Sequence, residues 1–119
     1  MSDVIEWVLE MDVQDGQWDN VGPLLDDMVA ATKADEPGAM HYEYYTDAEH
    51  TKVTVLERYA DNAAAMIHLG NFGAKFAERF LAVFAPTRIV VYGPAEDDLR
   101  AGMAGFGAMH MDYLKGFAR

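Results

Sequence analysis

Residues 38–59 read GAMHYEYYTDAEHTKVTVLERY and hold the clearest structural pattern of the chain. Residues 40–45 are rich in aromatic side chains, and residues 53–59 alternate between apolar and polar side chains, as strands with one buried face do. Residues 46–50 supply the turn between them. We therefore expect a hairpin whose second strand has one face formed by Val53, Val55, Glu57 and Tyr59.

Upstream of this hairpin, residues 5–13 also alternate, which predicts a first strand. Apolar residues at three- and four-residue spacing then predict a helix from Trp18 to Val29. Asp19 or Asn20 is the expected N-cap, with Pro23 in the first turn. Pro37 and Gly38 cannot continue this helix.

Downstream, Asp61 or Asn62 begins an alanine-rich helix that is expected to end near Gly70. A second helical stretch carries phenylalanines four residues apart from Phe72 to Phe84, and residues 89–92 predict a fourth strand. The order β-α-β-β-α-β is the ferredoxin-like plan of the α+β class.

The C-terminal part of the chain adds to this plan. We expect a single domain over residues 1–119, with a core at about residues 4–92 and an extension at about residues 93–119. The extension is predicted to contain a short helix over residues 96–103 and a strand-like segment over residues 109–117.

Composition limits the binding partners and the cellular location that we expect. The formal charge of −11 disfavours nucleic acid, because a phosphate backbone is repelled by such a surface. The chain has no cysteine, so disulfides, thiolate metal sites and a cysteine nucleophile are excluded. An acidic N-terminal stretch without a signal-peptide pattern, and no apolar run long enough for a bilayer, predict a cytoplasmic protein without a membrane partner.

A set of short features keeps its order along the chain: Gly38-Ala39-Met40-His41-Tyr42-Glu43, the hairpin, Leu56-Glu57-Arg58-Tyr59, then Asp61 to Ala65 and His68. From about Val4 to Tyr92 this pattern resembles the antibiotic biosynthesis monooxygenase family. In that family a glycine precedes a tyrosine-containing strand, the next strand ends in a glutamate followed by a basic or apolar residue and an aromatic, and a histidine follows in the helix.

The resemblance implies a homodimer in which two four-stranded sheets face each other as an α/β barrel, with the extension as an added arm. A sheet covered by helices on one side also needs a partner on the other, and we expect Tyr42, Tyr44, Val53 and Val55 to form an apolar patch there. The resemblance further implies oxygenation of quinols or phenols without metal, flavin or any other cofactor.

Two residues are candidates for the base that removes a substrate proton. His68 matches the helix histidine of the family, and imidazole titrates near neutral pH. Its structural alternative is a hydrogen bond to a backbone carbonyl or to Glu57. Glu57 lies on an apolar strand face, where burial raises a carboxyl pKa, or it is paired with an arginine or tyrosine and organises an interface.

Aromatic residues are the candidates for substrate binding. Tyr42, Tyr44 and Tyr59 could line a pocket and donate hydrogen bonds to a phenolic oxygen, or pack in the core or the dimer. Trp7 is a pocket residue or simple core. The histidines lack metal-site spacing, so no metal is expected. In haem-degrading relatives a tryptophan stands at the position of His68, which disfavours haem chemistry.

The leading hypothesis is a cofactor-independent monooxygenase acting on a quinol or on a phenolic, polyketide-type aromatic compound. The alternative is a noncatalytic dimeric module that binds a small apolar molecule. The space left around the aromatic side chains discriminates between the two.

Overall fold

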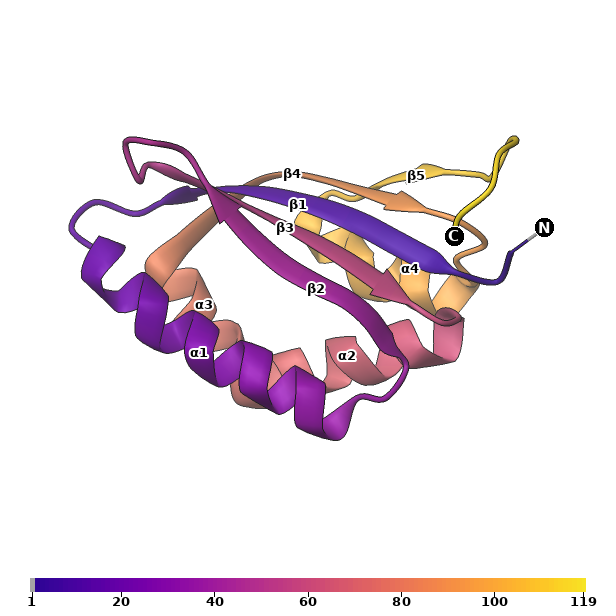
Figure 1. Ribbon diagram of the computed structural model, residues 1–119, viewed down its shortest axis with the longest axis horizontal. Helices are drawn as coiled ribbons and strands as arrows, with labels where there is room; N and C mark the ends of the chain where they lie inside the picture. Colours follow the sequence, from indigo (N-terminus) through magenta and orange to yellow (C-terminus); the bar gives the residue numbers. More distant parts are fainter. Residues whose placement is uncertain (1) are drawn as a thin grey trace.

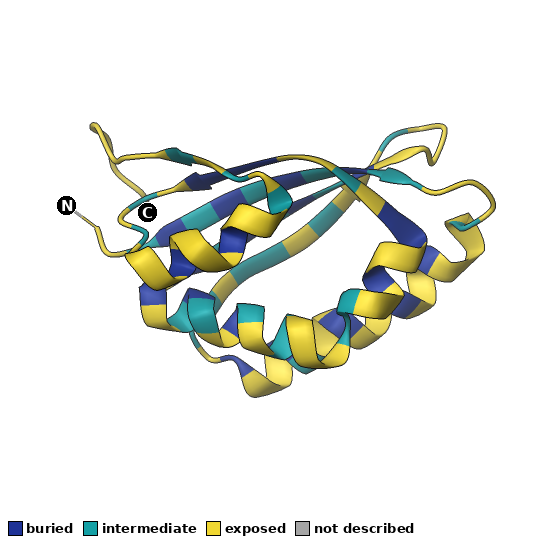
Figure 2. Ribbon diagram, turned by 180° about the vertical axis from the view of Figure 1, so that it is seen from behind, coloured by how far each residue is buried: buried dark blue, intermediate teal, exposed yellow. Residues whose placement is uncertain are grey.

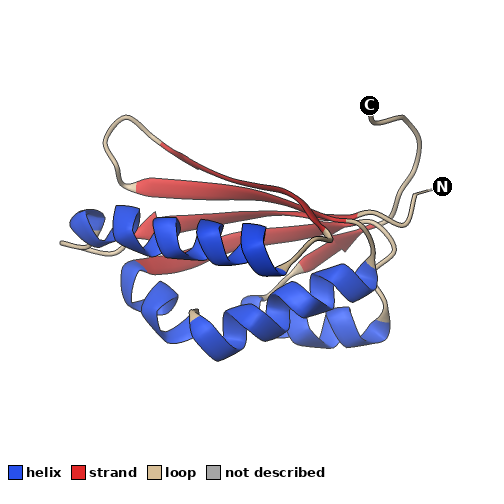
Figure 3. Ribbon diagram, turned by 60° about the horizontal axis from the view of Figure 1, so that its bottom comes forward, coloured by secondary structure: helices blue, strands red, loops and turns tan. Residues whose placement is uncertain are grey.

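A computed structural model describes residues 2–119 and shows a five-stranded mixed sheet with helices against one face (Figures 1 and 3). The strand order is β2-β3-β1-β4-β5. The elements run β1 (Ile5–Val13), α1 (Trp18–Asp35), β2 (Ala39–Thr46), β3 (Lys52–Tyr59), α2 (Asn62–Lys75), α3 (Ala77–Val83), β4 (Phe84–Tyr92), α4 (Asp97–Met103), a 3₁₀ turn η1 (Ala104–Phe106) and β5 (Met109–Met111). The predicted ferredoxin-like α+β fold is confirmed.

The first strand occupies the middle of the sheet. It pairs antiparallel with β3 on one side and with β4 on the other, and Trp7 lies opposite both Glu57 and Val91. Its alternation puts Ile5, Trp7, Leu9 and Met11 into the core. In Figure 2 the helices carry exposed residues on their outer sides and buried residues toward the sheet. The core therefore lies between the sheet and one helical layer.

Helix boundaries differ from the sequence expectation in two places. The N-cap of α1 is Gln17, and Pro23 lies inside the helix rather than near an Asp19 or Asn20 cap. The cap of α2 is Asp61, whose carboxylate accepts a hydrogen bond from the Ala64 amide at 2.8 Å. This helix continues past Gly70 to Lys75, because Leu69 and Phe72 pack on the core and stabilise the additional turn.

The predicted phenylalanine helix divides at Phe84, which begins β4. A strand over residues 89–92 was expected, but the observed strand begins five residues earlier and includes Pro86. Proline at position 86 cannot continue a helix, and a proline is tolerated in a strand at an irregularity. The β1–β4 register shifts between Glu10 and Met11, next to Pro86.

The extension adds α4, η1 and a short parallel strand. Leu99 and Met103 of α4 are buried in the core, and β5 pairs with the end of β4 from Val90 to Tyr92. The expected strand over residues 109–117 is three residues long, since the chain leaves the sheet after Met111. Leu114 and Phe117 beyond it are 93% and 82% exposed.

The open face of the sheet is less apolar than expected. Tyr42, Tyr44, Val53 and Val55 point toward the helices and pack on the core, so the expectation that they form a bare patch was wrong. Paired positions across β3, β1, β4 and β5 give the open face an apolar row formed by Leu56, Val8, Val90 and Met109, and Tyr92 and Met111 lie beside its β4–β5 end. Three ion pairs cross the neighbouring rows: Glu6–Arg58, Glu10–Arg88 and Asp12–Lys52.

Candidate active site

A small cavity lies between the sheet and the helices. Its volume is about 30 Å³, enough for one or two water molecules. Most of its wall is apolar, from all the main layers of the fold: Leu9, Met28, Val55, Leu69, Phe72, Phe80, Ile89, Met103 and Phe106. The polar part of the wall consists of Trp7, Tyr42, Tyr44, Glu57 and His68.

An ionic triad forms the polar end of this cavity: Glu36, His68 and Glu57. Nδ1 of His68 lies 2.8 Å from Oε1 of Glu36, and Nε2 lies 3.2 Å from Oε1 of Glu57. The three residues are 5–6% exposed. Glu36 is the C-cap of α1, Glu57 is on β3, and His68 is in the second turn of α2. The tertiary fold alone brings them together.

The two carboxylates hold a positive charge on the ring between them. Burial opposes that charge, but hydrogen bonds and charge attraction from Glu36 and Glu57 outweigh it and raise the pKa of His68 to about 9. Burial likewise opposes the charge of Glu36, and the hydrogen bond and charge of His68 outweigh it, so the pKa of Glu36 is lowered. At neutral pH His68 is therefore an imidazolium, held between the Glu36 and Glu57 side chains.

Glu57 is held by three donors. The Trp7 indole N–H donates to its Oε2 at 2.5 Å, and the Tyr59 hydroxyl donates to its Oε1 at 2.6 Å. His68 faces the same Oε1 atom. The indole and phenol rings pack against each other with centroids 4.8 Å apart and a tilt of 36° between their planes. These contacts fix the carboxylate at one edge of the cavity and satisfy a charge that would otherwise be buried without partners.

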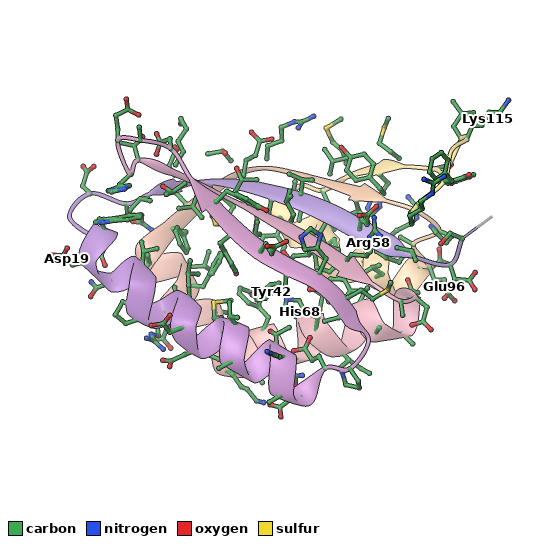
Figure 4. All side chains as sticks on the ribbon, viewed as in Figure 1. Asp19, Tyr42, Arg58, His68, Glu96 and Lys115 are labelled. Carbon is green, nitrogen blue, oxygen red and sulfur yellow. The ribbon has the colours of Figure 1, made fainter. Side chains whose placement is uncertain are left out.

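A pair of tyrosines faces the triad from β2. The Tyr42 and Tyr44 hydroxyls lie 2.7 Å apart, and the Tyr42 ring meets the His68 ring edge-on at 5.4 Å. Figure 4 shows Tyr42 and His68 close together between β2 and α2. Burial, and then the Glu57 charge, raise the pKa of Tyr42; burial and the neighbouring Tyr42 raise the pKa of Tyr44. Both phenols are therefore neutral donors at physiological pH.

Most of the residues singled out from the sequence converge here. His68, Glu57, Tyr42, Tyr44 and Trp7 share the cavity wall. Tyr59 stands behind Glu57 instead, fully buried, with its hydroxyl directed at the carboxylate. The bond between His68 and Glu57 and the pairing of Glu57 with a tyrosine correspond to the structural alternatives set out above, and both occur inside the subunit.

Sequence reasoning missed Glu36. One signal was available, because a carboxylate at the C-terminal end of a helix faces the negative end of the helix dipole and is unfavourable without a compensating cation. Glu36 also precedes Pro37, which turns the chain out of the helical conformation. His68 is the compensating cation, 32 residues further on.

Metal binding at this site has no support in the geometry. Within residues 2–119, no group of three histidine, aspartate or glutamate side chains could hold a metal ion. Both ring nitrogens of His68 face carboxylates as donors, which leaves no lone pair for a ligand bond. Across the same residues, no helix is both long enough and apolar enough to cross a membrane.

The fold and the site define a ferredoxin-like α+β protein with a buried acid–base cluster at one end of an apolar cavity. Residues 5–85 match the family model of the antibiotic biosynthesis monooxygenases. The chain belongs to this family. A search of curated proteins found no match.

Solved structures show the same fold. MupZ from Pseudomonas fluorescens is 21% identical, with a TM-score of 0.87 over 100% of this chain and 91% of that chain. A "putative antibiotic biosynthesis monooxygenase" from Caulobacter crescentus is 28% identical, with a TM-score of 0.62 over 76% and 86%. SnoaB from Streptomyces nogalater, a cofactor-independent oxygenase crystallised as an N63A mutant, is 15% identical, with a TM-score of 0.65 over 80% and 96%. The MupZ alignment therefore also includes the C-terminal extension.

Proposed function

We propose that the protein is a cofactor-independent monooxygenase that oxidises a quinol or a phenolic, polyketide-type aromatic compound. One observation carries the proposal: a carboxylate–imidazolium–carboxylate triad forms the polar end of an otherwise apolar cavity. An aromatic substrate fits such a wall, and oxygen chemistry on a substrate anion needs a base, a nearby positive charge and exclusion of water. Family membership and the cofactor-independent oxygenase among the structural neighbours support the same reading.

Glu57 is the proton acceptor in this proposal. His68 already carries its proton at neutral pH, and both cavity tyrosines are neutral donors. Among the described residues of the cavity wall, this leaves Glu57 as the group able to accept a proton. The His68 imidazolium then stabilises the negative charge that develops on the substrate oxygen and afterwards on reduced oxygen.

The reaction balances without an external reductant. Glu57 takes the phenolic proton, and the substrate anion transfers one electron to O₂, giving superoxide and a substrate radical. Their combination forms a carbon–oxygen bond and a peroxide anion, which takes the proton back from Glu57. The resulting hydroperoxide loses water and leaves a carbonyl. For a methylene carbon, CH₂ plus O₂ gives C=O plus H₂O, with one oxygen atom in each product.

Cavity size sets a condition on this function. A volume of about 30 Å³ holds no aromatic substrate, so the wall has to open by several side chains. Met103 and Phe106 of the extension form part of that wall. Both residues belong to short elements that few residues join to the sheet. We therefore expect α4 and η1 to move when the cavity opens for the substrate.

Oxygen uptake tests the proposal. Metal-stripped protein is assayed against anthrones, naphthoquinols and hydroquinones, and we expect one O₂ consumed per carbonyl formed. Glu57→Gln should lower turnover by about 10²-fold or more, as loss of a general base does. The matched control is Glu78→Gln, an exposed carboxylate on α3. No uptake above the spontaneous rate, or full activity in both Glu57→Gln and His68→Gln, would refute the assignment.

The tightness of the cavity favours a second candidate, the noncatalytic module that binds a small apolar molecule. Trp7 lies in the wall, so its fluorescence reports occupancy in a Trp18→Phe background. Saturable quenching by the same aromatic compounds, without oxygen uptake, would select the binding module over the enzyme.

We further propose a homodimer formed through the open face of the sheet. The support is the apolar row containing Val8 and Leu56, together with an arm whose Leu114 and Phe117 are exposed. A hollow of about 550 Å³ separates this arm from the sheet and offers room for a segment of a second copy. Sedimentation should give a dimer at micromolar concentration, and a Leu114→Ser, Phe117→Ser variant should dissociate more readily. A wild-type monomer would refute it.

A further inference from the structure

The triad has a second side that the proposed reaction does not use. Behind His68, away from the main cavity, lies a hollow of about 10 Å³, just large enough for one water molecule. Glu36, His68 and Asn71 line it, and the exposed pair Asp35 and Lys75 stands at its rim. His68 therefore lies between the main cavity on one side and a smaller hollow beside Glu36 and Asn71 on the other.

The contacts of Glu36 match this position. Its Oε1 accepts from Nδ1 of His68 at 2.8 Å, and its Oε2 accepts from the Asn71 amide at 3.3 Å. These two hydrogen bonds fix the orientation of the carboxylate. The hollow lies next to the carboxylate and to the imidazole ring. A histidine whose Nδ1–H is held in this way presents Nε2 in a fixed direction, here toward Glu57.

We infer that Glu36 is a positioning residue, which holds the His68 ring in its orientation and cationic state, and that the hollow behind it is where this ring exchanges its proton with solvent. The exchange is balanced: the imidazolium passes its Nδ1 proton to Glu36 and from there to water, leaving neutral imidazole, and the reverse steps restore it. The inference deepens the proposed function, because it concerns the same site, but it does not require turnover.

Several charged or titratable groups face His68, and all bear on its titration: Glu36 from the end of α1, Tyr42 from β2, Glu57 and Tyr59 from β3, and Lys75 near the hollow on α2. Tyr42 and Tyr59 are neutral, and the Lys75 ammonium is too far from the ring to affect its pKa strongly. Glu36 and Glu57 touch the ring nitrogens, and removal of either carboxylate charge should therefore shift the ring titration by about 1–3 pH units.

The test is an NMR titration of the His68 ring in the full chain. Glu36→Gln should move the His68 titration down by about 1 unit or more, and Glu36→Asp should restore most of the shift. Asp35→Asn removes a similar charge one residue away, at the surface, and should move it by less than about 0.3 units. Ala31→Leu, which places a larger side chain over the hollow, should sharpen the ring N–H signal by slowing its exchange, with the titration point unchanged.

Each result has a definite meaning. An unshifted titration in Glu36→Gln, or an Asp35→Asn effect of equal size, overturns the role of Glu36. Unchanged exchange in Ala31→Leu overturns the route. If Glu36→Gln does not fold, the wild-type protein still decides, because a His68 that titrates at its ordinary value is incompatible with the inference. Absence of oxygen uptake would sink the proposed reaction and leave these measurements intact.

Discussion

The buried triad makes stability depend on pH in a direction opposite to that of most carboxylate pairs. The pKa of His68 is about 9 in the folded chain and near 6.5 when the chain is unfolded. Below pH 6.5 the ring is protonated in both states, between 6.5 and 9 only in the folded state, and above 9 in neither. The stabilisation is therefore complete below pH 6.5 and is lost as the pH rises through 9.

The size of the effect follows from the shift. A difference of about 2.5 units corresponds to about 3 kcal/mol, at 1.36 kcal/mol per unit. His68 is 6% exposed, so solvent screening removes little of it. The lowered pKa of Glu36 acts in the other direction, because its contribution is present above 4.5 and is lost as the pH falls below that value. Between pH 6 and 9.5 the titration of His68 therefore determines how stability changes with pH.

The perturbation is a triple variant, Glu36→Gln, Glu57→Gln, His68→Gln, which keeps side-chain size and hydrogen bonding but has no ionisable group in the triad. Replacing a buried ionic cluster with neutral groups can leave stability at neutral pH unchanged or raise it. The sign of the stability difference at a single pH therefore does not test whether His68 is charged. The pH dependence does decide. The stability difference, wild type minus variant, should fall by about 3 kcal/mol between pH 6 and pH 9.5.

Urea unfolding at half-unit pH intervals measures this difference. The range ends at pH 9.5 because unfolded tyrosines titrate near 10, while Tyr42, Tyr44 and Tyr59 stay neutral in the folded chain. His50→Asn, at an exposed turn, is the control for loss of a histidine. A stability difference that stays level across the range would show that His68 is neutral in the folded protein, and the charge assignment of the site would fall.

Three further predictions concern packing and capping. Tyr42→Phe and Tyr44→Phe should each cost about 1–2 kcal/mol in urea unfolding by leaving the other hydroxyl unpaired, while the double variant should cost less than the sum; additive losses would contradict the pairing. Gly38→Ala should cost about 1–3 kcal/mol, because its Cβ would lie 2.5 Å from the Ala64 Cβ, and Ala64→Gly should relieve part of this loss in thermal unfolding. Asp61→Ala should lower stability by about 1 kcal/mol through loss of the α2 cap, and no change would indicate that the cap hydrogen bond is exchanged for water.

Local patterns predicted the layout of the sheet well. Alternation along β1 and β3 grouped the residues that share the apolar face of each strand, since the side-chain period of a strand is two. Phe84 could not be assigned in this way, because its four-residue spacing from Phe80 continues the helical pattern while its backbone already belongs to β4. The tertiary pairing of β4 with β1 decides that boundary.

The site was predictable only in part. His68 and Glu57 are adjacent in space because α2 packs across β3, and the order of elements made that contact foreseeable. Pro37 predicts that α1 ends near Glu36, but only the tertiary fold brings this end beside His68 of α2. The open face was misjudged because alternation groups Tyr42 and Tyr44 with the valines of β3 on one face but does not tell which face the helices cover.

The short parallel strand β5 also bears on the solubility of the protein. Edge strands carry unpaired amide and carbonyl groups that can recruit a strand from another molecule, and natural sheets shield them. β5 occupies the hydrogen-bonding groups of β4 from Val90 to Tyr92, where the strand is most apolar. A chain shortened before Met109 would leave this edge bare beside Val90, and such a fragment should aggregate during refolding even though its core remains complete.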